Sequence, residues 1–173
     1  TIIFNPPYLP QDEGIEDSAL YGGKKGWEIS ERFFNQAANF LAPCGKILFL
    51  FSSLTHKTKI DEMISYNLLE AQELAREKLP FFEELYVYLI QKSELLWELE
   101  QKRVSDVHFL AQGHRGVVYS GSWNTNYNVG SQVVLPKLVK VAIKVENSHS
   151  KAFHRIENEA KWLERLNKEG IGP

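Results

Sequence analysis

The chain has 173 residues, of which 43% are hydrophobic, and its formal net charge is −2. Acidic and basic residues are mixed along it, so it lacks the basic field that duplex-binding proteins need, and nucleic acid is not expected as a partner. The single cysteine, Cys44, has no second thiol for a disulfide or a zinc site, which indicates a reducing, cytoplasmic setting. Membrane insertion is not expected, because no apolar run approaches the roughly 20 residues that span a bilayer.

Residues 1–92 predict an α/β unit. Two prolines end its first strand, because proline cannot donate to a strand ladder. A later, almost continuously apolar strand is typical of a parallel sheet covered on both faces. The predicted elements, in chain order, are a strand at 1–4, a helix with apolar positions Ile29, Phe33, Ala37, Phe40 and Leu41, a strand at 46–52, a helix at 57–67, and two strands separated by Pro80 that form a hairpin. The aromatic residues expected in the core are Trp27, Phe33, Phe34 and Phe40.

Residues 93–103 predict a helical connector, and residues 104–173 predict a second, α+β unit of antiparallel strands with one helix. Glycine and asparagine turns dominate this second unit. Its predicted elements are strands at 108–112, 117–123 and 137–145, and a helix at 151–169 with Phe153, Ile156, Ala160, Leu163 and Leu166 on one face and a stop at Gly170. The chain begins inside a predicted strand and ends just after a predicted helix, so we expect both ends to be cuts in a longer protein, whether a fragment or a natural fusion.

The segment Asn5-Pro6-Pro7-Tyr8, at the predicted strand end, carries the parts needed for methyl transfer to a planar nitrogen. Such a transfer requires the nitrogen lone pair to be turned out of conjugation and aimed at the donor carbon. An asparagine side-chain oxygen and the next backbone carbonyl can accept both N–H protons, while a following aromatic face clamps the planar group. The prolines stiffen the backbone and lower the entropy cost of that alignment.

This segment, with Phe4 before it, resembles the Asn-Pro-Pro-Tyr motif of class I amino-methyltransferases, which modify adenine, cytosine or glutamine nitrogens. Further segments are similar to the archaeal and eukaryotic release-factor glutamine methyltransferases of the HemK family: Leu9-Pro10, residues 19–28, residues 52–55 and residues 81–87. The resemblance covers residues 1–92. It implies a partial class I, Rossmann-like sheet with a terminal hairpin.

The resemblance also implies an activity, in which S-adenosylmethionine methylates the glutamine of a Gly-Gly-Gln loop in a peptide release factor. Asn5 and Pro6 would hold the amide, Pro7 would restrain the backbone and Tyr8 would pack on the amide, with Phe4 and Asn5 on the cofactor side. A small zinc-binding activator protein is a further implied partner. The family places its glycine-rich cofactor loop and its ribose-binding acid upstream of the motif, and neither is present in the 173 residues, so we expect these residues alone to bind the cofactor poorly.

The second unit contains candidates for a kinase small lobe, which needs a glycine hairpin over the phosphates, a strand lysine and a helix glutamate that holds the lysine. They are Gly113, Gly116, Lys144 and Glu159. Lys144 is expected to be buried among aliphatic neighbours, where an ammonium requires a carboxylate partner. Glu157 is the competing partner, with poorer spacing to the leucines of the helix.

Residues 104–173 resemble protein kinases, in particular small archaeal Ser/Thr kinases related to the RIO type, with Val141-Ala142-Ile143-Lys144 as the most specific segment. The resemblance implies ATP with Mg²⁺ as a cofactor. Ala111 stands where the first glycine of the hairpin is expected. The catalytic-loop Asp and Asn and the Asp-Phe-Gly segment are absent from the 173 residues, so we do not expect them to transfer phosphate.

Three interpretations follow from the sequence. The first is a cytoplasmic protein-glutamine methyltransferase joined to a kinase-like, ATP-binding segment. The second keeps the methyltransferase fold but makes a nucleic-acid base, such as the N6 of adenine, the methyl acceptor; the absence of a basic stripe argues against it. The third is a non-catalytic binding module in which the kinase-like fold only provides an interaction surface.

Overall fold

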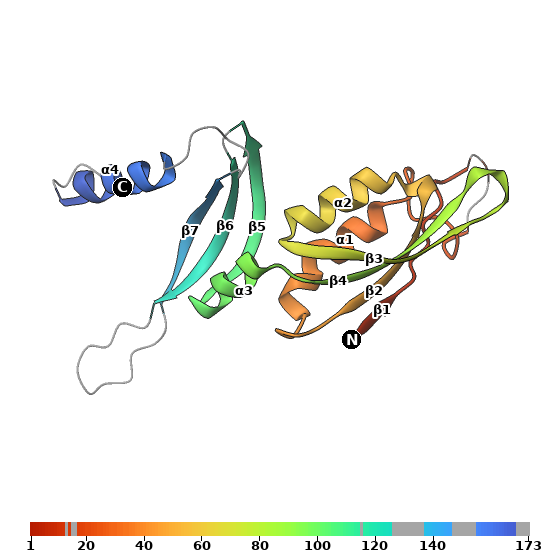
Figure 1. Ribbon diagram of the computed structural model, residues 1–173, viewed down its shortest axis with the longest axis horizontal. Helices are drawn as coiled ribbons and strands as arrows, with labels where there is room; N and C mark the ends of the chain where they lie inside the picture. The colour runs from red at the N-terminus through yellow and green to blue at the C-terminus, as the bar shows by residue number, and fades with distance from the viewer. Residues whose placement is uncertain (13, 15–16, 115, 126–136, 147–154, 169–173) are drawn as a thin grey trace.

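The computed structural model describes residues 1–12, 14, 17–114, 116–125, 137–146 and 155–168 (Figure 1). They form a four-stranded sheet, a three-stranded sheet and four α-helices, which confirms a mixed α/β architecture. The predicted first turn of the last helix with Phe153, the predicted helix stop at Gly170 and most of the polar loop before residue 137 lie outside the described residues.

The first sheet contains β1 (Ile2–Phe4), β2 (Ile47–Ser52), β3 (Leu69–Lys78) and β4 (Glu84–Lys92), in the order β1-β2-β4-β3. Strands β1 and β2 are parallel, with Phe4 opposite Phe49. Strand β4 is antiparallel to both of its neighbours, so the predicted hairpin is present. Because Leu85, the second residue of β4, is opposite Ser52, the tip of the hairpin lies at the edge where β1 and β2 end. We call this edge the acceptor edge.

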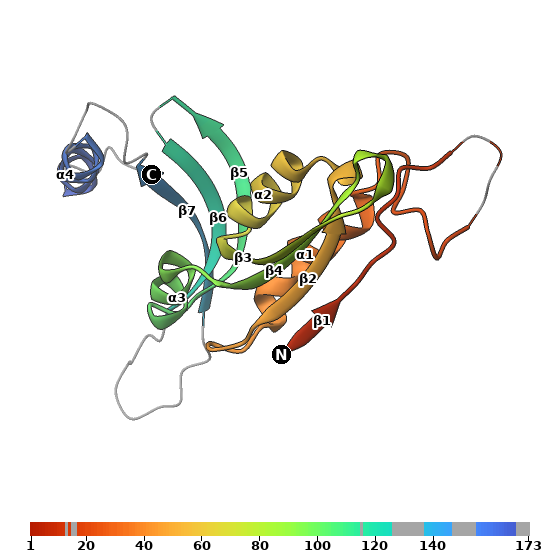
Figure 2. The ribbon, with the colours of Figure 1, turned by 45° about the vertical axis from the view of Figure 1, so that its right-hand side comes forward.

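Two helices, α1 (Glu28–Phe40) and α2 (Lys57–Tyr66), pack on one face of the first sheet (Figures 1 and 2). They bury the side chains of Phe34, Ala37, Leu41, Ile60, Met63 and Ile64 against Ile47, Phe49, Phe51, Tyr86, Tyr88 and Ile90 of the sheet. On the other face Ile3 is exposed and Leu48 and Leu50 are half-buried. For the described residues, the prediction that both faces of β2 are covered is therefore wrong.

The end of α1 corrects a second prediction. Phe40 shares the helical spacing of the core residues, yet it is 79% exposed. It is the last residue of α1, where the helix passes beyond the sheet, and the following Leu41 turns back and is buried instead. Phe40 is therefore a surface residue at the edge opposite the acceptor edge.

The predicted connector contains α3 (Glu94–Gln101), which Ser93 caps by accepting a hydrogen bond from the Leu96 N–H. After it, β5 (Val104–Gly113), β6 (Gly116–Thr125) and β7 (Lys137–Glu146) form an antiparallel sheet in that order, followed by α4 (Arg155–Lys168). One face of this sheet packs against α3 of the connector and against the first unit, so that Tyr119 of β6 is buried with Leu96 of α3 and with Leu68. The Tyr66 ring of α2 stacks on Phe109 of β5 at 4.2 Å between centroids.

Helix α4 has the predicted apolar stripe but little covers it. Leu163 is 47% exposed and Ala160 is exposed, while Ile156 and Leu166 are half-buried. The stripe is thus not buried by the described residues of the second unit. Within the described part of the chain, no helix is long and apolar enough to cross a membrane.

Candidate functional site: the acceptor edge

The Asn-Pro-Pro-Tyr segment follows β1 directly, so the parallel pairing of β1 with β2 places it at the acceptor edge. Asn5 is exposed there and Pro6 is buried. Phe4 stacks on Phe33 of α1 at 3.9 Å between ring centroids. This packing anchors the strand end in the core and leaves the Asn5 amide at the surface, where a substrate can reach it. The Phe4 ring packs in the core that α1 covers. These contacts do not test its position on the cofactor side, which stays a prediction.

A second segment, residues 20–26, holds the backbone of the motif in place. The N–H of Leu9 donates to the Leu20 carbonyl and the N–H of Gly22 donates to the Leu9 carbonyl, both at 3.0 Å. A Cβ atom on Gly22 would lie 2.5 Å from the Pro7 carbonyl oxygen, closer than real Cβ contacts allow. Glycine is therefore required at residue 22 for this close approach. The two sequence segments form one structural unit.

The same loop is tied to the start of α1 and to the end of β2. The Glu28 carboxylate accepts a hydrogen bond from the Lys25 N–H, and the ammonium of Lys25 lies 5.3 Å from the centre of the Trp27 ring. Trp27 also meets His56 edge to face, with 5.3 Å between ring centroids. Because His56 follows the turn after β2, these contacts fix the loop against both neighbouring elements.

The end of β2 carries a hydroxyl network that joins it to the hairpin. The buried Ser52 hydroxyl donates to Glu83 Oε1 at 2.6 Å and accepts from the Leu54 N–H. Ser53 Oγ accepts from the Glu84 N–H at 3.0 Å. Sequence reasoning assigned residues 52–55 only by resemblance and did not find this network, because its partners are 31 residues apart.

The acceptor edge presents hydrogen-bond acceptors at the end of β1. The Asn5 oxygen and the Pro6 carbonyl are acceptors that suit the N–H groups of a planar amide. The glycines of the adjoining loop do not form a cofactor cradle, since Gly22 and Gly26 are occupied by close contacts with the backbone of Pro7 and Tyr8. The described residues thus present two hydrogen-bond acceptors for an amide and do not account for an adenosine pocket.

In the second unit, the structure brings together the predicted lysine and glutamate. Lys144 Nζ lies 2.5 Å from Glu159 Oε2. Lys144 is paired in register with Val118, two positions from the Gly116–Glu146 pair at the glycine hairpin. A Cβ atom on Gly116 would lie 2.2 Å from the Val145 carbonyl oxygen, so β6 and β7 approach each other closely there.

The expected burial of Lys144 is wrong, because its side chain is 41% exposed and that of Glu159 is 51% exposed. Lys144 lies on the sheet face opposite the one that packs on the first unit, next to the largely uncovered α4. Among the residues that the structure describes, no group of three or more His, Cys, Asp or Glu side chains could hold a metal ion. Lys144 is therefore a partly exposed lysine that is paired with a glutamate, and the described residues do not account for Mg²⁺.

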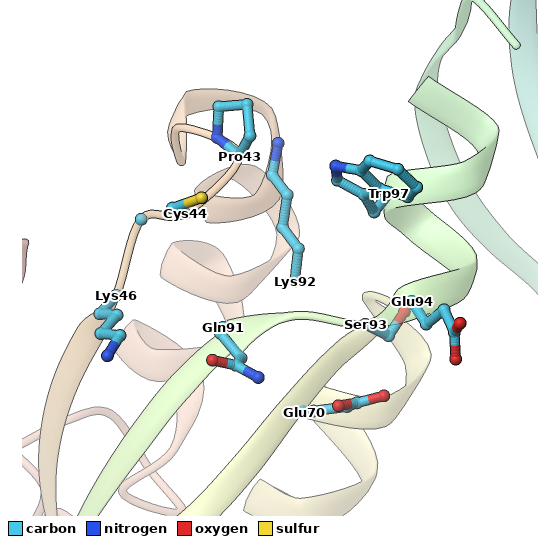
Figure 3. A pocket seen from close by; sticks show the side chains of 10 residues that line it. Pro43, Cys44, Lys46, Glu70, Gln91, Lys92, Ser93, Glu94 and Trp97 are labelled. Carbon is cyan, nitrogen blue, oxygen red and sulfur yellow. The ribbon is translucent and has the colours of Figure 1, made fainter. Parts of the chain in front are cut away.

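A pocket at the opposite edge of the first sheet is not part of either site (Figure 3). It lies between the start of β2, the end of β4 and α3, and its lining includes Lys46, Lys92 and Trp97. The Lys92 ammonium is already paired with Glu100. This pocket lies before the start of β2, whereas Asn5 follows the end of β1, and its lining does not include Asn5.

Comparison with known proteins finds a similar methyltransferase. No family model matches the chain. A protein of Methanocaldococcus jannaschii, described as a candidate protein N5-glutamine methyltransferase, is 41% identical over 91 residues, which are 50% of this chain and 46% of that protein. The chain thus spans about half the length of this relative. Among solved structures, the E. cuniculi Mtq2–Trm112 complex, which methylates the translation termination factor eRF1, shares 23% identity over 53% of this chain and 50% of that chain, with a TM-score of 0.43.

The fold is that of a mixed α/β protein in which the segment Asn5-Pro6-Pro7-Tyr8 follows a strand of a parallel pair. Half of the chain is similar to a protein N5-glutamine methyltransferase.

Proposed function

We propose that the first unit is the acceptor-binding half of an S-adenosylmethionine-dependent N-methyltransferase, and that its substrate is a glutamine side-chain amide of a peptide release factor. The observation that carries the proposal is the position of Asn5-Pro6 directly after β1, at the edge where two parallel strands end. Open α/β sheets bind their ligands outside the carboxyl ends of such strands. The identity of 41% with a relative of the same described activity supports this choice of substrate.

The proposed mechanism depends on how the amide is held. The Asn5 oxygen and the Pro6 carbonyl accept the two N–H groups and orient the nitrogen, and the Tyr8 ring packs on the amide plane. The buried Pro6, the neighbouring Pro7 and the Gly22 contact keep these acceptors fixed before the substrate arrives. The cofactor, when bound, supplies an electrophilic methyl carbon to the oriented nitrogen.

Replacement of Asn5 by Ala in the full-length protein tests this role. We expect methyl transfer to a purified release factor to fall by roughly 10²–10³-fold, as for the loss of other preorganised hydrogen-bonding groups in active sites. The unfolding midpoint should hardly change, because Asn5 is exposed. Asn39→Ala, at another exposed asparagine on α1, is the matched control. Unchanged turnover of Asn5→Ala would refute the assignment.

The alternative acceptor is a nucleic-acid base, since the same motif geometry can hold the N6 amino group of adenine. The net charge of −2 with mixed charges makes this second choice less suitable. Parallel assays with radiolabelled cofactor, one with a release factor and one with oligonucleotides, separate the two. Transfer to oligonucleotides alone would replace our proposal by this alternative.

For the second unit we propose an ATP-binding, kinase-like role, supported by the Lys144–Glu159 ion pair and by the close approach of Gly116 to β7. Protein kinase activity would require the catalytic and Mg²⁺-binding residues that the 173 residues lack. If nucleotide does not bind, the unit is an interaction module, the third interpretation above. The small zinc-binding activator is proposed only on the resemblance, and a rise in soluble yield on co-expression would support it.

A further inference from the structure

The tip of the β3–β4 hairpin exposes two adjacent phenylalanines. Phe81 is 96% exposed and Phe82 is completely exposed. Single apolar side chains at a surface are ordinary, but two adjacent aromatic rings that nothing covers form a contiguous apolar contact point. Aromatic side chains supply much of the binding energy where proteins associate. We call this pair the aromatic tip.

The backbone of the aromatic tip is held in a defined shape. Phe81 and Phe82 have φ angles of 63° and 64°, in the left-handed region that bulky residues rarely adopt. Below them the hairpin closes through a hydrogen bond from the Leu79 N–H to the Glu83 carbonyl at 2.8 Å. Glu83 is in turn tied to the buried Ser52. The rings are therefore carried on a loop that is attached to the end of β2.

This attachment places the aromatic tip on the same side of the molecule as the methyl-acceptor motif. Leu85, the second residue of β4, is opposite Ser52, and β2 lies between β4 and β1, which Asn5 follows. The hairpin and the loop after β1 extend from the same end of the sheet in both views (Figures 1 and 2). Two strand spacings alone separate β1 from β4 by roughly 10 Å. A ligand that contacts both Asn5 and the aromatic tip must therefore be larger than a glutamine side chain or a single base.

The chemistry around the aromatic tip favours a protein over a nucleic acid. Around the hairpin tip, the carboxylates of Glu77, Glu83 and Glu84 stand against two basic side chains, Lys78 and Arg76, and Arg76 lies 3.9 Å from Glu84. These charges nearly balance and give no basic cluster of the kind that binds a phosphate backbone. A protein substrate could instead cover both rings with an apolar patch next to the loop that carries its methyl-accepting glutamine. Little hydration of polar groups would be lost in such a contact.

We propose that Phe81 and Phe82 are a docking point for the protein substrate, which they contact next to the loop that delivers its glutamine to Asn5. This inference rests on the proposed methyltransferase function. It predicts that the aromatic tip determines the affinity for a whole protein substrate and leaves the chemical step at Asn5 unchanged.

The test compares methyl transfer by the full-length protein to a purified release factor and to a short synthetic peptide that contains Gly-Gly-Gln. For the double variant Phe81→Ser/Phe82→Ser we expect KM for the release factor to rise at least about tenfold, or about 1.4 kcal/mol of lost binding. The kcat on the release factor and the KM for the peptide should not change. Phe40→Ser, at an exposed phenylalanine of the opposite edge, is the matched control and should leave both KM values unchanged.

A second variant, Phe81→Gly/Phe82→Gly, suits the left-handed backbone and should show the same rise in KM if the serine variant folds poorly. An unchanged KM for the release factor in both variants, with normal transfer by the wild type, would overturn the docking proposal alone. An equal rise for the peptide, or an equal rise in Phe40→Ser, would also overturn it. Absence of transfer by the wild type to either substrate would refute the proposed function and this inference with it.

Discussion

Lys144 on β7 and Glu159 on α4 form an ion pair between residues 15 positions apart in the chain, with 2.5 Å between Nζ and Oε2. Both side chains are partly exposed, at 41% and 51%, so the pair contributes little to stability. Its structural effect is to hold the ammonium on the face that also carries Val118, near the glycine hairpin. The contact was expected from the sequence, whereas its role in nucleotide binding stays a prediction.

Replacement of Lys144 by Met should therefore abolish ATP binding with little change in unfolding free energy, on the order of 0.5 kcal/mol or less, as for exposed ion pairs. Titration of the full-length protein with a fluorescent ATP analogue measures the affinity for nucleotide, and urea unfolding measures the unfolding free energy. Lys140→Met is the matched control, because Lys140 is on the same strand and bonds only to Ser122 Oγ among the contacts described here. Equal nucleotide affinity in wild type and Lys144→Met would refute the role of Lys144, whereas absence of nucleotide binding by the wild type would favour the interaction-module interpretation.

The order and type of the elements could be predicted from the sequence because their signals are local. Prolines at residues 6 and 7 end a strand, helical spacing of apolar residues defines α1, and Pro80 separates the strands of a hairpin. The pairing of Lys144 with Glu159 rather than Glu157 was also predicted, because spacing along one helix decides which side chain shares a face with the leucines.

Burial could not be predicted in the same way, because it depends on what covers each face. Phe40 and Leu41 both fit the apolar pattern of α1, but only Leu41 reaches the core. The apolar run of β2 indicated a strand covered on both faces, whereas α1 and α2 pack on one face only. The contacts from Ser52 to Glu83 and from Tyr66 to Phe109 join residues far apart in the sequence, and no local pattern indicates them.

Gly22→Ala should displace the backbone of the Asn5-Pro6-Pro7-Tyr8 motif. The added methyl group would lie 2.2 Å from the Gly26 carbonyl oxygen and 2.5 Å from that of Pro7, so one backbone segment must move. We expect a loss of about 1–3 kcal/mol in unfolding free energy, typical of overpacking, together with reduced methyl transfer. Gly113→Ala is the control for a glycine replacement, because a Cβ atom there meets open space and its φ is not in the left-handed region. Wild-type kinetics for Gly22→Ala would show that the loop does not position Asn5.

Ser52→Ala should loosen the link between β2 and the aromatic tip. It removes the buried hydroxyl that donates to Glu83 Oε1 and accepts from the Leu54 N–H, which costs about 1–3 kcal/mol where a partner is left without its bond. Chemical unfolding measures this loss. Hydrogen exchange of the Glu84 N–H should also accelerate, because its bond to Ser53 depends on the same hairpin geometry. Stability and exchange equal to wild type would contradict a structural role for this network.

The Tyr119 hydroxyl makes the stability of the interface between the two units sensitive to alkaline pH. Burial raises the pKa of Tyr119 above its ordinary value of 10.0, and the nearby Tyr66 adds to the effect. The folded state therefore holds this proton more tightly than the unfolded state, so the stabilisation is complete below about pH 10 and is lost as pH rises further. Urea unfolding at about pH 8 and about pH 10.5 should show a smaller loss in Tyr119→Phe than in wild type, because the variant has no proton to release. The loss of stability that remains in Tyr119→Phe comes from other groups. Tyr88 is one of them, because burial raises its pKa as well. An identical pH dependence in the two proteins would mean that Tyr119 is not buried in solution as it is here, and that the contact of β6 with α3 is open.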